Sequence, residues 1–191
     1  MKKLLIVATA AMILSACGVS TPDIEVYTPE NGETIAIMYI DMADAPTPAE
    51  WGWVRSFEPV DNKEKFQIFS KEDKKLGTIL YAQKLKPGSY YVERVSGYNP
   101  GKAFVQWEQE ATYRLGSEKS PSIKFKVSNQ GVLYLGSYKY VKYKSKFGKD
   151  GDFSINSANA PTEKEVLTAF LDKADDKKVK KMIMERLARI K

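Results

Sequence analysis

Alternation of apolar and polar side chains runs through the middle of the chain and predicts β-strands. In residues 103–115 the apolar side chains occupy one parity and the polar ones the other, which is typical of a strand with one buried face. Ile123, Phe125 and Val127 repeat that pattern between polar neighbours. In residues 34–40 both parities are largely apolar, and this predicts a central strand that is covered on both faces.

Further runs of aromatic and β-branched residues predict strands at 51–57, 66–70, 78–85, 89–98 and 138–147. Lys149-Asp150-Gly151 then predicts a hairpin with a strand at 152–156, because Asp-Gly tolerates the positive φ angles of such turns. No amphipathic helix interrupts the series. We therefore expect residues 34–160 to form a mainly β domain, an antiparallel β-sandwich or barrel-like sheet.

Residues 161–191 change to helical spacing of apolar side chains and predict a C-terminal α-helical appendage. Thr162 and Glu165 have the spacing of a capping box, which marks a helix start. The polar stretch 172–178 interrupts the apolar stripe, and Asp175 is a candidate cap for a second helix. One bent helix and two short helices both fit. We expect this segment to pack on its own sheet rather than in the groove of a partner.

The first residues have a different organisation, with Lys2 and Lys3 followed by an apolar run of 11 residues from Leu4 to Leu14. As a helix this run would rise about 16 Å, roughly half the hydrocarbon thickness of a bilayer. It is therefore expected to be the apolar region of a signal peptide and not a membrane span. The tetrapeptide Leu14-Ser15-Ala16-Cys17 follows at once.

This segment resembles the signal peptide and lipobox of bacterial lipoproteins. The resemblance implies cleavage between Ala16 and Cys17, diacylglyceryl attachment at Cys17, and anchoring of the remaining chain to a membrane of the cell envelope. Gly18 resembles the residue found in lipoproteins sent to the outer membrane, if the host is Gram-negative. Residues 1–16 are then a signal peptide and residues 17–33 a lipidated N-terminus and tether. The alternative is a secretory peptide without lipidation.

Composition narrows the chemistry, because the 191 residues include no histidine and one cysteine. The absence of histidine excludes histidine-dependent nucleophiles and histidine-ligated metals. A single cysteine excludes an intrachain disulfide and a thiolate zinc cluster. The net charge is +6, but residues 1–16 carry two lysines and no acidic residue. Much of the remaining basic excess lies in residues 161–191, so we expect no nucleic-acid partner.

A second resemblance concerns Leu85-Lys86-Pro87-Gly88-Ser89-Tyr90-Tyr91-Val92. This stretch is similar to a turn and strand of prealbumin-like and carboxypeptidase-regulatory-like β-sandwiches. The run from Gly131 to Gly136 is similar to a strand of uncharacterised bacterial lipoproteins of that type. The resemblance implies a fold and brings no catalytic residue with it.

A basic run is the first candidate for binding, since Lys142, Lys144 and Lys146 share one face of a predicted strand. Such a face suits acidic glycans, lipid phosphates or an anionic membrane. A solvated lysine face that protects a sheet edge explains the same pattern and is favoured.

Glu108 and Glu110 are candidate catalytic carboxylates, because alternate strand residues project about 6.5 Å apart on one face. A solvated strand face is the favoured interpretation. Trp51, Trp53 and Trp107 are candidates for a sugar-stacking platform, although core positions are favoured for them.

Together these features predict a lipid-anchored cell-envelope lipoprotein that acts as a non-enzymatic binding or envelope-assembly module. Its expected contacts are the membrane, through Cys17, and an envelope protein or glycan; no cofactor and no metal are expected. The alternatives are a glycan-active enzyme that uses Glu108 or Glu110 and a structural envelope protein.

Overall fold

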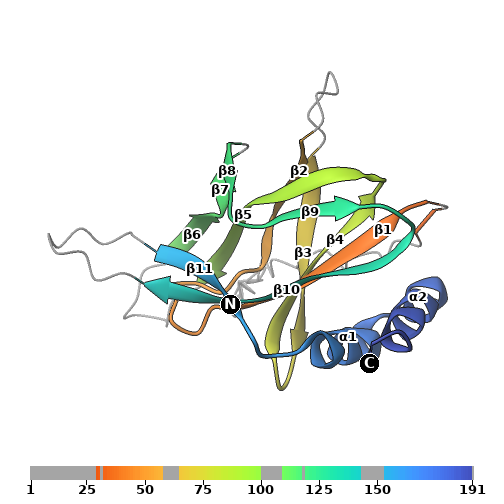
Figure 1. Ribbon diagram of the computed structural model, residues 1–191. Helices are drawn as coiled ribbons and strands as arrows, with labels where there is room; N and C mark the ends of the chain where they lie inside the picture. Colours follow the sequence, from red (N-terminus) through yellow and green to blue (C-terminus); the bar gives the residue numbers. More distant parts are fainter. Residues whose placement is uncertain are drawn as a thin grey trace, which may run out of the picture.

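A computed structural model describes residues 29–30, 32–57, 65–99, 109–117, 119–142 and 153–190. Within these ranges the chain forms a large β-sheet followed by two α-helices (Figure 1). The strands are β1 (Thr34–Asp41), β2 (Trp51–Ser56), β3 (Lys65–Asp73), β4 (Gly77–Leu85), β5 (Gly88–Asn99), β6 (Gln109–Arg114), β7 (Gly116–Ser117), β8 (Ser120–Pro121), β9 (Lys124–Val127), β10 (Gly131–Lys142) and β11 (Phe153–Ala158). The helices are α1 (Glu163–Lys173) and α2 (Lys177–Leu187).

The main sheet has nine strands, eight of them in the order β11-β10-β1-β4-β3-β2-β5-β6, with β9 paired to β5. It curls so far that its two ends face each other, since the rings of Tyr113 in β6 and Phe153 in β11 lie 5.5 Å apart. This confirms the prediction of a mainly β, barrel-like sheet. One pairing departs from the antiparallel expectation, because β1 and β10 run parallel.

Curling gives the sheet an inner and an outer face, and β1 is buried on both. Ala36, Met38 and Ile40 belong to the cluster that fills the inner face. Ile35 and Ile37 belong to a second cluster, which the helices complete on the outer face. The prediction that this strand is covered on both faces is therefore confirmed.

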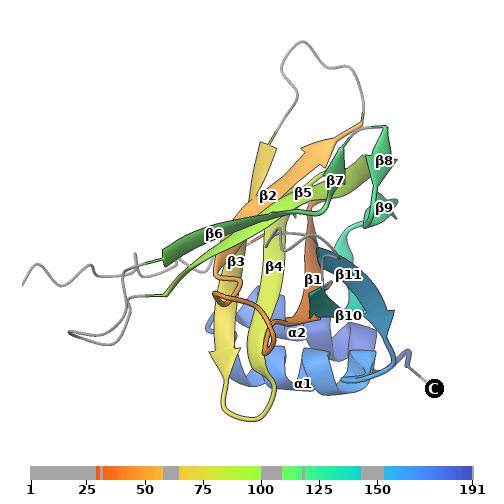
Figure 2. The ribbon, with the colours of Figure 1, turned by 90° about the vertical axis from the view of Figure 1, so that its left-hand side faces the viewer.

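The C-terminal segment forms two helices, which lie across the outer face of the sheet (Figure 2). Thr162 and Glu165 make the predicted capping box at the start of α1. The second cap is Asp176 and not Asp175: its carboxylate accepts from the backbone N–H groups of Lys178 and Val179, at 2.8 and 2.9 Å. No helix within the described ranges is long and apolar enough to cross a bilayer.

Core positions were favoured for the tryptophans of β2, and this prediction is wrong. Trp51 and Trp53 are only half-buried and project from the outer face, whereas Gly52 and Val54 are buried on the inner face. A Cβ at position 52 would lie 2.3 Å from the carbonyl oxygen of Arg94. Gly52 therefore permits a close approach between β2 and β5 that a larger side chain would prevent. Trp107 lies outside the described residues.

Candidate binding site between β3 and β4

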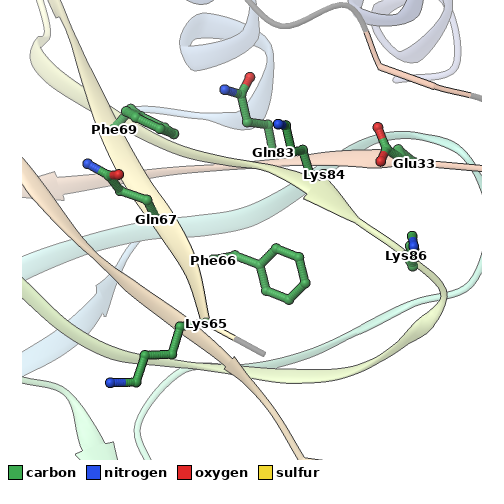
Figure 3. A pocket seen from close by; sticks show the side chains of 8 residues that line it. All are labelled: Glu33, Lys65, Phe66, Gln67, Phe69, Gln83, Lys84 and Lys86. Atoms are coloured by element: carbon green, nitrogen blue, oxygen red, sulfur yellow. The ribbon is translucent and has the colours of Figure 1, made fainter. Parts of the chain in front are cut away.

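Strands β3 and β4 separate partway along their length, and this opening forms the candidate site. Their antiparallel pairing runs from Asp73 opposite Gly77 to Ile68 opposite Ala82 and then stops. Residues 65–67 continue along β2, while residues 83–85 stay with β1. The two strands enclose a hollow of about 540 Å³ between their diverging ends (Figure 3).

A β-bulge in β4 shapes one side of the hollow. Ala82 and Leu85 are three residues apart, so in a regular strand they would face opposite sides of the sheet, yet both lie in the inner cluster. The register of β4 against β1 shifts in this stretch, and Lys84 adopts a φ of 66°. The extra residue returns Leu85 to the core and leaves Gln83 and Lys84 beside the hollow.

In the close-up view, the ring of Phe66 lies between Lys65 and Gln67 of β3 on one side and Lys86, which follows β4, on the other (Figure 3). Its ring packs edge-on against Tyr90 at 5.6 Å, and Tyr90 stacks on Phe125 at 5.7 Å. The Tyr90 hydroxyl also donates to the carbonyl of Lys86 at 2.8 Å. Tyr90 therefore contacts both Phe66, on the floor of the hollow, and the turn that carries Lys86.

A second aromatic row borders the hollow on the outer face. Phe69 lies 5.6 Å from Tyr81, whose ring packs against Phe170 of α1 at 5.0 Å. Burial raises the pKa of the Tyr81 hydroxyl, so Tyr81 stays neutral at physiological pH. The hollow thus has apolar walls that are anchored in both hydrophobic clusters of the protein.

Among the described residues, the rim of the hollow carries more lysines than carboxylates. Lys65, Lys84 and Lys86 line it and are exposed, whereas the one carboxylate among the described lining residues belongs to Glu33, which is 6% exposed. The Glu33 carboxylate accepts from the backbone N–H of Glu30 at 2.9 Å. Gln67 adds an amide that can both donate and accept hydrogen bonds. This arrangement suits an anionic ligand that is rich in hydroxyl groups.

An ion pair joins β2 to β5 beside the strand that carries Lys65. Arg55, which lies opposite Lys65 in the β2–β3 pairing, contacts the Glu93 carboxylate at 2.8 Å. The hydrogen bond from Arg55 holds the pKa of Glu93 below its usual value, and the charge of Lys65 acts in the same direction. Glu93 is therefore ionised at neutral pH and makes a charge-assisted contact with Arg55.

Most of the site residues expected from the sequence lie away from this hollow or outside the described residues. Five of these site residues lie outside the part of the chain that the structure describes: Ala16, Cys17, Glu108, Lys144 and Lys146. Glu110 belongs to β6, where its side chain is not described, and β6 is separated from β3 by β2 and β5.

Lys142 is exposed at the end of β10, opposite Phe153 of β11. Because β10 runs parallel to β1, that end lies beyond Asp41, whereas the hollow adjoins Glu33 at the start of β1. Strand β10 pairs with β1 as far as Lys139 and with β11 from Ser137 to Lys142, so among the described pairings Lys142 has a strand partner on one side.

The hollow itself was missed in the sequence, although one signal was present. The apolar positions Ala82 and Leu85 break the alternation of their strand, and such a break is typical of a bulge. Among the described residues, no three His, Cys, Asp or Glu side chains are grouped as metal ligands. No protein-family model, curated protein or solved structure matches the chain.

Proposed function

We propose that this protein is a lipid-anchored module of the cell envelope that binds an acidic glycan in the hollow between β3 and β4. The observation that carries the proposal is the rim itself: lysines from both diverging strands surround an aromatic floor with amides beside it. Ammonium groups recognise carboxylates and sulfates, while amides recognise sugar hydroxyls. An aromatic ring supplies the apolar surface on which a sugar ring rests.

The proposed anchor rests on Leu14–Cys17, which resembles a lipobox. The only cysteine of the chain stands where lipidation requires it. Two or three acyl chains hold a protein durably at a bilayer, because each buried methylene contributes about 0.8 kcal/mol. A module held in this way samples envelope glycans within the reach of its tether and needs no catalytic group to do so.

Calorimetric titration of the purified full chain with hexagalacturonate tests the binding step, with maltohexaose as the uncharged comparison. We expect heat of binding only with the acidic oligosaccharide. Lys65→Gln together with Lys86→Gln should weaken binding by about 10- to 100-fold, because two charge-assisted contacts are lost. Lys74→Gln together with Lys75→Gln is the matched control: these lysines are exposed at the opposite end of β4 and should change the Kd by no more than about twofold.

Equal weakening by both lysine pairs would show that net charge, not the hollow, governs binding. Binding of maltohexaose as tightly as of the acidic oligosaccharide would exclude an acidic glycan as the preferred ligand. The anchor is tested separately, by labelling cells with a palmitate analogue. The native chain should be labelled and Cys17→Ala should not; equal labelling would remove the lipid anchor from the proposal.

A further inference from the structure

Helix α2 carries two exposed lysines on the side that faces away from the sheet. Val179, Met182 and Ile183 are buried against the outer-face cluster and nearby strands. With a helical repeat of 3.6 residues, Lys177 and Lys181 then lie on the opposite side of the helix, and both are exposed. Their positive charge is turned toward the surroundings of the protein.

Little within the described part of the chain balances this charge. Lys177, Lys180 and Lys181 form no ion pair there, and the ion pair of α2 joins Arg186 to Glu163 of α1 at 2.6 Å. Glu185 is exposed on α2, but it is one acidic residue beside several lysines. The outward surface of α2 therefore has a net positive charge.

An apolar side chain lies among these lysines. Met184 is 52% exposed, more than any other large hydrophobic side chain of the described residues, and it follows Lys181 by three positions on the outward side. A flexible thioether between lysines is the combination by which a peripheral helix enters the headgroup layer of a bilayer.

The position of α2 brings this surface close to the point where the N-terminal tether joins the fold. The Lys178 ammonium donates to the carbonyl of Pro29. Cys17 and Pro29 are 12 residues apart, so an anchor at Cys17 lies no more than about 40 Å along the chain from α2. The anchored bilayer is therefore within reach of the basic helix.

We propose that the outward face of α2, formed by Lys177, Lys181 and Met184, docks on anionic lipid headgroups of the membrane that holds the anchor. This inference rests on the proposed lipidation of Cys17. Each basic residue near an anionic membrane favours docking by roughly fivefold. The contact fixes the orientation of the sheet relative to the bilayer, and with it the direction in which the hollow between β3 and β4 opens.

The experiment uses the lipidated full chain carrying Met184→Cys, labelled with an environment-sensitive dye. The protein is reconstituted in vesicles of phosphatidylcholine alone or of phosphatidylcholine with phosphatidylglycerol, some containing brominated acyl chains. We expect a blue shift and bromine quenching only in the anionic vesicles. Adding Lys177→Gln and Lys181→Gln should lower the ratio of docked to undocked protein about 30-fold, whereas Lys74→Gln with Lys75→Gln should leave it unchanged.

Three results would overturn the inference. Equal quenching in zwitterionic and anionic vesicles would show that charge does not direct the contact. A blue shift in detergent without phospholipid, accompanied by dimerisation, would assign the surface to a second copy of the chain. Absence of quenching in either vesicle would show that α2 stays in water.

The same preparation tells failure of this inference apart from failure of the anchor. The native chain has one cysteine, so in a lipidated Met184→Cys variant only position 184 reacts with the dye. Mass spectrometry that finds two dyes per chain would remove the anchor. One dye together with acyl chains but no quenching would remove the docking surface alone.

Discussion

The two helices have the same length, 11 residues, and cover the same hydrophobic cluster, yet their first turns have opposite chemistry. Helix α1 begins with a complete capping box and has Glu163 and Glu165 in its first turn. Helix α2 has no acidic residue in its first turn, where Lys177 and Lys178 stand. The amino end of a helix is partially positive, so these lysines are placed against the helix dipole.

This contrast separates what the fold requires from what it does not. On their buried sides both helices satisfy the rules of packing, with apolar residues at helical spacing against the sheet. The first turn of α1 also follows the electrostatic rule, whereas the first turn of α2 holds lysines, although the cap of α2 is the Asp176 carboxylate and Arg186 stands in its last turn. Local departures of this kind are expected where a surface serves binding rather than stability.

The largest expected effect tests whether the buried side chains of the two helices contribute equally to the stability of the fold. Leu167 of α1 and Ile183 of α2 are both fully buried. Leu167→Ala and Ile183→Ala should each lower the free energy of unfolding by about 3 kcal/mol, because each leaves a cavity beneath a helix. Urea denaturation followed by circular dichroism measures both values. A loss below about 1 kcal/mol for Ile183→Ala alone would mean that α2 is not anchored as α1 is.

Much of this helical region could be predicted from the sequence, because its signals are local. Thr162 with Glu165 marks a start, and the stripe of apolar residues marks the buried side. The cap that begins α2 as a separate helix is Asp176, whereas the sequence pattern indicated its neighbour Asp175. Two adjacent aspartates have the same capping chemistry, and only the backbone decides which of them stands at the cap.

Several features of the sheet could not be predicted from local sequence patterns. Core positions were favoured for Trp51 and Trp53, but the buried parity of β2 holds Gly52 and Val54. The parallel pairing of β1 with β10 joins segments about a hundred residues apart, and nothing in either strand specifies the partner. The hollow depends on where two strands stop pairing, which is a property of the sheet and not of one segment.

A smaller effect sharpens the electrostatic difference between the helices. Lys177→Glu should raise the free energy of unfolding by about 0.5 kcal/mol, because it reverses a charge at the amino end of α2 and places Glu four residues before Lys181. Lys164→Glu, in the first turn of α1, should change the free energy of unfolding very little, since Glu163 and Glu165 already stand there. Thermal denaturation at low salt compares the two variants. Equal gains would show that the first turns do not differ in electrostatic strain.

The smallest effect concerns acid, which should act on the capping box at the start of α1. The Thr162 backbone N–H and, to a lesser extent, its hydroxyl donate to Glu165 and hold the pKa of that carboxyl below 4.5, its ordinary value. The folded pKa is thus lower than the unfolded one, so the box stabilises α1 fully above about pH 4.5 and loses this contribution as the pH falls through the folded pKa.

An NMR titration of the Glu165 carboxyl carbon measures that pKa directly. Thr162→Val removes the hydroxyl and keeps the backbone N–H, so the pKa of Glu165 should rise only partway toward 4.5. A pKa at 4.5 in the native chain would contradict the capping box. Acid should therefore weaken the start of α1.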